Sequence, residues 1–66
     1  MKIRLNGDDY ITKAASTVSE LLVELNINPM RVAVELNMVI VKKAEYGSAA
    51  LKDGDNVEVV NFVGGG

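Results

Sequence analysis

The nine residues Thr17-Val18-Ser19-Glu20-Leu21-Leu22-Val23-Glu24-Leu25 carry a complete signal for a short amphipathic helix. Thr17 and Glu20 have the spacing of a capping box, in which the threonine hydroxyl accepts from the Glu20 amide and the carboxylate reaches back. The apolar stripe behind this cap has helical spacing and consists of Val18, Leu21, Leu22 and Leu25. A helix of about two to three turns is marginal in isolation, so we expect its stripe to pack on a sheet.

The residues before this helix predict a β-hairpin. Residues 1–5 alternate between apolar and polar side chains, which is typical of a strand with one buried face. The buried side chains would be Met1, Ile3 and Leu5. Asn6-Gly7 favours a type I′ turn, because both central residues of that turn need positive φ. Residues 10–13 predict the returning strand, and the sequence leaves open whether Tyr10 or Ile11 faces the core.

The residues after the helix predict further strands. Pro29 cannot continue a helix and marks its end. Residues 31–36 alternate with period two, residues 39–41 form a short apolar run, and residues 56–62 predict the last strand. The side chains expected to face inward are Val32, Val34, Leu36, Val57 and Val59. Residues 42–50 have no clear period and predict a loop with at most one helical turn.

The predicted order of elements indicates the fold class. A helix that connects an N-terminal hairpin to a third strand usually crosses one face of the sheet in a right-handed connection. The expected fold is therefore α+β, of the ubiquitin-like β-grasp type, with a mixed sheet and one main helix across it. Leu51 is the expected core residue of the last loop. Asp53-Gly54-Asp55 predicts a turn rather than a calcium loop, because the glutamate of that motif is missing.

Composition excludes several classes of function. The 66 residues suffice for one domain, and 48% of them are hydrophobic. The chain has no Cys and no His, so it lacks thiolate ligands, disulfides and the usual general base. Its net charge of −2 offers no basic stripe for nucleic acid, and no apolar run approaches the roughly 20 residues of a membrane span. We expect a cytoplasmic protein that binds neither nucleic acid nor membrane.

No spacing of residues suggests a catalytic pair. A nucleophile and its base would have to come from Ser, Thr, Lys or Tyr. Glu20 is explained as a helix cap, and the cations Arg31, Lys42 and Lys43 are expected to face solvent. We therefore expect a protein that is not an enzyme and that binds no metal and no cofactor.

The remaining candidate site lies at the C-terminal end. We expect residues 1–62 to form the β-grasp domain and residues 63–66 to form a flexible glycine-rich tail. Alternation places the side chains of Val60 and Phe62 on the face away from the core, although a bulge that turns Phe62 inward is an alternative. An exposed apolar patch of this kind marks a protein partner. The docking candidates are Val60, Phe62 and Val63.

The glycines offer one chemical handle, the α-carboxylate of Gly66. Gly64 and Gly65 carry no Cβ, so such a tail can enter a narrow enzyme channel. A carboxylate is ionised at neutral pH and is a poor acyl donor, so it needs activation, and acyl-adenylate formation with ATP is the usual route. The chain has no phosphate-binding glycine loop followed by a helix, so a partner enzyme would supply the ATP site and magnesium. The alternative is a frayed terminus or a leftover linker.

Several motifs together resemble one family. They are Met1-Lys2-Ile3, Thr17-Val18-x-Glu20-Leu21-Leu22, Val32-Ala33-Val34-Glu35-Leu36-Asn37, Asp53-Gly54-Asp55 and Gly65-Gly66. In this combination the chain resembles the sulfur carrier proteins of thiamine biosynthesis, over essentially its whole length. One departure is the third glycine, Gly64, where two define the family motif.

The resemblance implies a sulfur-transfer cycle. A ubiquitin-activating-type adenylyltransferase would adenylate the carboxylate of Gly66. Sulfur from a cysteine desulfurase persulfide would displace AMP and leave a thiocarboxylate, which thiazole synthase would use to build the thiazole moiety of thiamine. The alternatives are the small subunit of molybdopterin synthase, another sulfur carrier, or a β-grasp interaction module that carries no sulfur.

Overall fold

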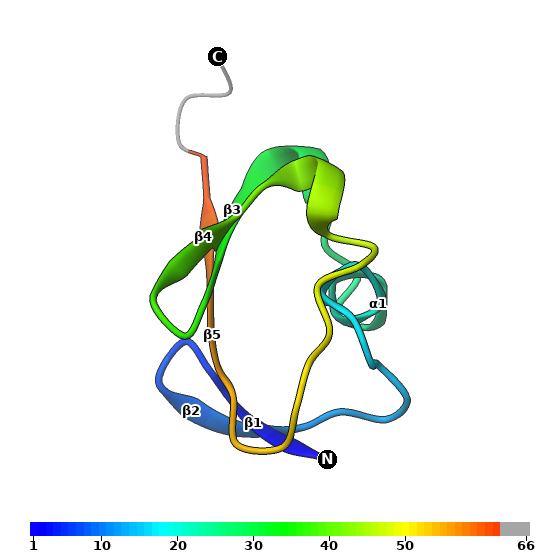
Figure 1. Cartoon of the computed structure of the whole chain (residues 1–66), viewed down its shortest axis with the longest axis vertical. Helices are drawn as coiled ribbons and strands as arrows, with labels where there is room; N and C mark the ends of the chain where they lie inside the picture. The colour runs from blue at the N-terminus through cyan, green and yellow to red at the C-terminus, as the bar shows by residue number, and fades with distance from the viewer. Residues whose placement is uncertain (63–66) are drawn as a thin grey trace.

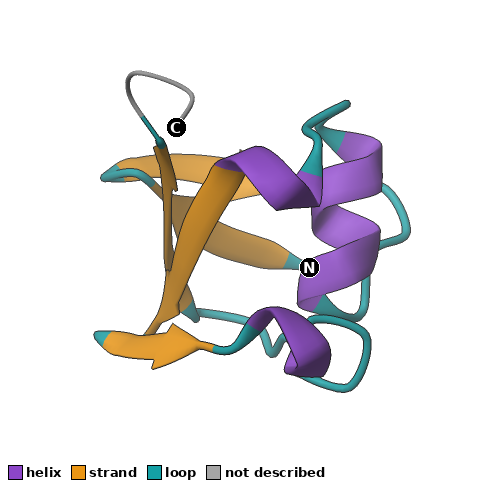
Figure 2. Cartoon of the chain, turned by 90° about the horizontal axis from the view of Figure 1, so that it is seen from above, coloured by secondary structure: helices purple, strands orange, loops and turns teal. Residues whose placement is uncertain are grey.

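The computed structural model describes residues 1–62, which fold as a mixed sheet with the main helix on one side (Figures 1 and 2). The strands are β1 (Lys2–Leu5), β2 (Asp8–Ile11), β3 (Val32–Leu36), β4 (Val39–Val41) and β5 (Asn56–Asn61). The helix α1 covers Val18–Glu24, and the short 3₁₀ helices η1 and η2 cover Pro29–Arg31 and Lys43–Glu45. Residues 63–66, the predicted tail, lie outside the described residues, so the flexibility expected for them stays a prediction.

The sheet has the order β2-β1-β5-β3-β4, in which β1 and β5 pair in parallel and the other neighbours pair antiparallel. The N-terminal hairpin and the β3–β4 hairpin therefore flank a central strand that comes last in the sequence. This arrangement confirms the predicted α+β class, the mixed sheet and the single main helix across it. It also places the C-terminal end of β5 next to the start of β3.

The helix is capped at both ends by side-chain and backbone hydrogen bonds. Thr17 Oγ1 accepts from the Glu20 amide at 3.2 Å, as predicted. The Glu20 carboxylate reaches one residue further back than a standard capping box, to the amide and hydroxyl of Ser16, both at 2.8 Å. At the other end Asn26 adopts φ 59°, and the Ile27 amide donates to the Leu22 carbonyl at 2.8 Å. This is a Schellman motif with Asn in the left-handed position, so the helix ends before Pro29 is reached.

The N-terminal hairpin corrects two predictions. Asn6 and Gly7 both have positive φ, and Leu5 pairs directly with Asp8. Because a two-residue turn pairs the residues that flank it, the returning strand spans Asp8–Ile11 instead of the predicted 10–13. The same register pairs Ile3 with Tyr10, so Tyr10 faces the core and Ile11 faces solvent. Met1 was expected to face inward but is 39% exposed, because β1 begins at Lys2 and Met1 lies at the rim of the sheet.

The core lies between α1 and the inner face of the sheet. The buried hydrophobic residues are Ile3, Ala15, Val18, Leu21, Leu22, Val32, Val34, Tyr46, Leu51 and Val57. Most of them belong to the predicted helical stripe and the predicted inward strand faces, and Leu51 is the predicted loop anchor. The predicted core residues Leu5, Leu25, Leu36 and Val59 are half-buried and pack against this cluster. Tyr46 and Ala15 were not predicted, because neither lies in a periodic segment.

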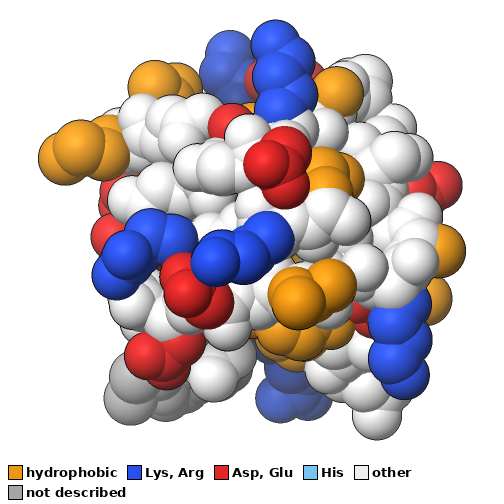
Figure 3. All heavy atoms as spheres, turned by 90° about the horizontal axis from the view of Figure 1, so that it is seen from below, with side chains coloured by type: hydrophobic (Ala, Val, Ile, Leu, Met, Phe, Trp, Pro, Cys, Tyr) orange, Lys and Arg blue, Asp and Glu red, His pale blue; other side chains and the backbone are white. Residues whose placement is uncertain are grey.

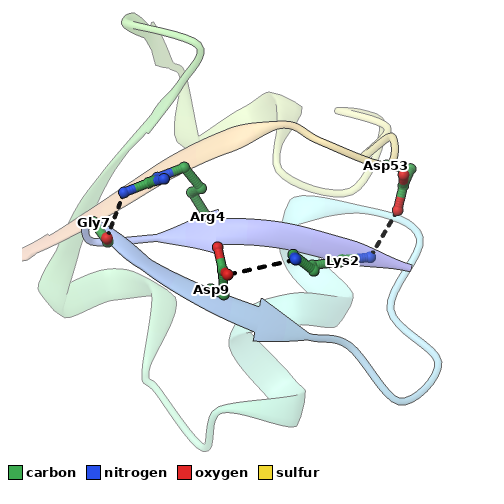
Figure 4. A network of polar contacts seen from close by, with 5 residues as sticks. All are labelled: Lys2, Arg4, Gly7, Asp9 and Asp53. Carbon is green, nitrogen blue, oxygen red and sulfur yellow. Dashed lines mark hydrogen bonds and ion pairs between the residues drawn. The ribbon is translucent and has the colours of Figure 1, made fainter.

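The turn at residues 53–55 ties the start of β5 to β1 (Figure 4). The Lys2 amide donates to the Asp53 carboxylate at 2.8 Å, and the Gly54 amide donates to the Lys2 carbonyl at 2.8 Å. Lys2 Nζ also lies 3.4 Å from the Asp9 carboxylate on the neighbouring strand. The turn at residues 53–55 therefore holds the start of β5 against β1.

The surface of the described residues is mixed in charge. Figure 3 shows one face on which Lys and Arg side chains lie beside Asp and Glu side chains, with separate hydrophobic groups between them. Among residues 1–62, no helix is long and apolar enough to cross a bilayer.

Candidate functional site

The C-terminal end of β5 exposes two large apolar side chains, as the sequence predicted. Val60 is 55% exposed and Phe62 is 56% exposed. Val60 pairs with Ala33 on β3, and the Phe62 amide donates to the Arg31 carbonyl at 2.9 Å. Phe62 therefore continues the ladder without the bulge that would have turned it inward. Val63, Gly64, Gly65 and Gly66 lie outside the described residues, and their roles stay predictions.

The opposite edge of β5 is held by a side chain rather than by a strand. Asn6 Oδ1 accepts from the Val59 amide at 2.7 Å, and Asn6 Nδ2 donates to the Val59 carbonyl at 3.2 Å. The ladder between β1 and β5 ends at the pair Leu5–Val57, so Asn6 extends it by one position. Val59, just before Val60, is thus held on both sides, by β3 and by Asn6.

An ammonium group lies against the ring of Phe62. Lys43 Nζ donates to the carbonyls of Val32 at 2.7 Å and of Pro29 at 3.1 Å. The same nitrogen lies 5.0 Å from the centroid of the Phe62 ring and 5.6 Å from that of Tyr46. The sequence predicted that Lys42 and Lys43 both face solvent. Both residues are exposed, as predicted, but η2 also brings the ammonium of Lys43 against the carbonyls of Pro29 and Val32, which the sequence did not predict.

The acidic side chains of α1 are occupied by local hydrogen bonds. The Glu24 carboxylate accepts from the Tyr10 hydroxyl and from the amides of Lys13 and Ala14. The Tyr10 hydroxyl and then these amides hold the pKa of Glu24 below its usual value, and the same hydrogen bond raises the pKa of Tyr10. The Ser16 amide and hydroxyl lower the pKa of Glu20 in the same way. Both carboxylates therefore fasten the loop at residues 12–16 to the helix.

The described residues hold no candidate metal centre. Among residues 1–62, no three His, Cys, Asp or Glu side chains come together in a way that could bind an ion. The Asp55 carboxylate accepts from the Lys52 amide at 2.8 Å and from the Asn37 side chain at 3.0 Å. This agrees with a turn at residues 53–55 and gives no support to a calcium loop.

Comparison with known proteins identifies the family. The model of the ThiS family matches residues 3–66. The chain is 38% identical over 65 residues to the sulfur carrier protein ThiS of Bacillus subtilis, covering 97% of this chain and 98% of that protein. The crystal structure of the thiamine biosynthesis protein ThiS from Geobacter metallireducens superimposes with a TM-score of 0.85 at 35% identity, over 100% of both chains.

A second kind of relative contains a segment like this chain within a longer protein. The thiazole synthases of Magnetococcus marinus and Paramagnetospirillum magneticum are 44% and 46% identical over 66 residues. These matches cover 100% of this chain, which spans only 20% of the length of either protein. The full-length match of the family model, the B. subtilis relative and the ubiquitin-like β-grasp structure agree, so the chain belongs to the ThiS family and has the predicted resemblance to the sulfur carriers of thiamine biosynthesis.

Proposed function

We propose that this ThiS-family sulfur carrier of thiamine biosynthesis carries its sulfur on the carboxyl group of Gly66. Among the described residues, the hydroxyls of Ser16 and Tyr10 each donate to a carboxylate of α1, and these contacts are explained by their role in fastening the loop at residues 12–16 and β2 to the helix. The acidic groups of α1 and of the turn at residues 53–55 are thus engaged in local hydrogen bonds. The remaining reactive group that we consider is therefore the α-carboxylate of Gly66. The chain acts as a carrier, and its partner enzymes perform the catalysis.

The observation that carries the proposal is the exposed pair Val60 and Phe62, which only Val63 separates from the three glycines in the sequence. We call Val60 and Phe62 the docking surface. Large apolar side chains in such positions serve as interface anchors, and a partner that binds them has residues 64–66 within reach of its active site. Val63 is a further candidate for this contact.

The proposed loading proceeds in balanced steps. The Gly66 carboxylate attacks the α-phosphorus of ATP on a ubiquitin-activating-type adenylyltransferase, which gives an acyl adenylate and releases pyrophosphate. The terminal sulfur of a cysteine desulfurase persulfide then attacks the acyl carbon and expels AMP, which leaves an acyl persulfide. A second thiol attacks the sulfur of the donor cysteine, so that a disulfide forms and the thiocarboxylate departs. ATP and magnesium belong to the partner enzyme.

Thiazole synthase is the proposed acceptor of the sulfur. The thiazole synthases of M. marinus and P. magneticum each contain a segment similar to this whole chain, which supports a functional connection between such a segment and thiazole synthesis. When a carrier and its acceptor are joined in one polypeptide, each is present at a high effective concentration near the other. These longer relatives therefore support the proposal that such a carrier delivers its sulfur to thiazole synthase.

Isotope-labelled sulfur tests this assignment. The carrier, loaded from a labelled persulfide, is incubated with thiazole synthase in one reaction and with the large subunit of molybdopterin synthase in another. We expect the label in the thiazole product alone. Label transferred only to molybdopterin would contradict the assignment to thiamine biosynthesis.

A further inference from the structure

The ammonium group of Lys43 joins segments that are distant in the sequence. It donates to the carbonyl of Pro29 in η1 and to that of Val32 at the start of β3. It also lies on the aromatic ring of Phe62, the residue that follows β5. Lys43 itself comes from η2, which follows β4. The carbonyl contacts fix the ammonium without help from Phe62, so the cation is a preformed support for the ring.

The contact with Phe62 is attractive and directional. The face of an aromatic ring carries negative charge density, and a cation within about 6 Å of its centroid is attracted to it. The distance from Lys43 Nζ to the centroid of the Phe62 ring is 5.0 Å. Without such a support, a ring that is 56% exposed has few contacts to hold it in one rotamer. Lys43 therefore selects one orientation of Phe62 while leaving much of the ring open to solvent.

We propose that Lys43 is a positioning residue for the docking surface, because its ammonium holds the Phe62 ring in the orientation that the activating enzyme binds. This inference rests on the proposed function, in which Phe62 contacts that enzyme. Holding the ring beforehand reduces the conformational entropy that is lost on binding. Lys43 acts through Phe62 and takes no part in the chemistry at Gly66.

The neighbouring residue Lys42 supplies a matched control. Lys42 has the same charge and is exposed, and among the described residues its side chain forms no hydrogen bond or cation–π contact. Lys43→Met keeps much of the apolar stem and removes the ammonium, whereas Lys43→Arg keeps a cation with several donors. Phe62→Leu removes the ring and keeps an apolar side chain.

The kinetic experiment measures pyrophosphate release by the activating enzyme with ATP as the carrier concentration varies. We expect Lys43→Met to raise the KM for the carrier about threefold to tenfold, as the loss of one cation–π contact predicts, with kcat unchanged. Lys43→Arg should restore most of the affinity, and Lys42→Met should not change it. In the double variant Lys43→Met/Phe62→Leu, the KM should equal that of Phe62→Leu alone.

Proton NMR of the carrier alone gives a readout that does not require the enzyme. The ε-methylene protons of Lys43 should be shifted upfield by the Phe62 ring and should return toward the free-lysine value in Phe62→Leu. Equal KM values for Lys43→Met and the wild type, or additive effects in the double variant, would overturn the inference. An unshifted Lys43 signal would overturn it even if Lys43→Met failed to fold. Absence of pyrophosphate release with the wild type would instead contradict the proposed function.

Discussion

The side chain of Asn6 takes the place of a neighbouring strand for the backbone of Val59. Its amide group accepts from the Val59 N–H at 2.7 Å and donates to the Val59 carbonyl at 3.2 Å, across 53 residues of sequence. Asn6 also adopts φ 51° in the hairpin turn, a conformation that Asn tolerates better than most residues. Asn6 therefore contributes to the hairpin turn through its backbone and holds β5, which leads to the docking surface, through its side chain.

Replacing Asn6 should destabilise the fold through this contact. We expect Asn6→Gly, which keeps positive φ accessible, to lower the free energy of unfolding by about 1 kcal/mol, because the Val59 backbone loses its partner. Asn6→Asp keeps the acceptor and loses the donor, so its effect should be smaller. Urea unfolding followed by circular dichroism measures both. A Gly variant as stable as the wild type would show that the contact contributes nothing.

The turn of the second hairpin offers a stabilising substitution. Met38 adopts φ 70° and is 82% exposed, so its backbone is strained and its side chain packs against little. Met38→Gly should raise the free energy of unfolding by about 0.5–1 kcal/mol, because the left-handed conformation costs a residue with a Cβ about 1–2 kcal/mol. The greater freedom of Gly in the unfolded chain offsets part of this gain.

Gly7→Ala is the matched control for that substitution. Gly7 has φ 88°, and nothing lies within 4 Å of an added Cβ, so the cost of Ala is conformational rather than steric. Thermal unfolding should show Gly7→Ala melting below the wild type and Met38→Gly melting above it. Two shifts of the same sign would contradict the assignment of strain to the positive φ at Met38.

The hydrogen-bonded carboxylate of Glu24 should make part of the folding stability depend on pH in the acid range. Its pKa is lowered from 4.5 in the folded state, mainly by the Tyr10 hydroxyl. The charged form is therefore favoured on folding, and its contribution is present above the unfolded pKa and is lost as the pH falls through the lowered folded pKa. In Glu24→Gln this part of the pH dependence should vanish, so stability should fall less steeply between neutral and acid pH.

Glu45→Gln serves as the control for this pH effect. Glu45 is exposed, and it faces no carboxylate across the sheet because it lies in η2. Comparison of the two variants distinguishes the hydrogen bonds of Glu24 from the loss of one surface carboxylate. Urea midpoints measured at several pH values separate the variants. If the urea midpoints of Glu24→Gln and of the wild type changed with pH in the same way, protonation of Glu24 would not be coupled to folding.

The docking surface should matter for binding more than for stability. Phe62→Ala removes a ring that is 56% exposed, so the melting temperature should change little. Its affinity for the activating enzyme should fall about tenfold or more, as truncation of an interface anchor does. Val23→Ala, on the solvent face of α1 and 76% exposed, is the control that should change neither quantity. Calorimetry measures the affinity, and strong destabilisation by Phe62→Ala would place the ring in the core.

Local signals account for the parts of the fold that were predicted correctly. The Thr17 cap and the helical stripe lie within one segment, and the turn at Asn6-Gly7 lies between its own strands. The exposure of Val60 and Phe62 also followed from alternation within one strand. Such features depend on neighbours in the sequence, so the sequence alone could reveal them.

Contacts between distant segments account for the parts that were missed. Lys43 reaches Phe62 because η2 lies near the end of β5, and the loop that contains η2 has no period to indicate where its side chains point. Tyr46 is buried in that loop for the same reason, and its hydroxyl lies 3.4 Å from the Val32 carbonyl. The pairing of Asn6 with Val59 likewise depends on the parallel contact between the first and last strands.

Mass spectrometry of the intact chain tests the central claim most directly. The protein is incubated with the activating enzyme, ATP, a cysteine desulfurase with cysteine, and a thiol. Exchange of one carboxylate oxygen for sulfur at Gly66 predicts a gain of about 16 Da, which the acyl activation makes possible. The variant that lacks Gly65-Gly66 should show no gain. An unchanged wild-type mass, or the same gain in the truncated variant, would contradict the assignment of the sulfur to the Gly66 carboxyl group.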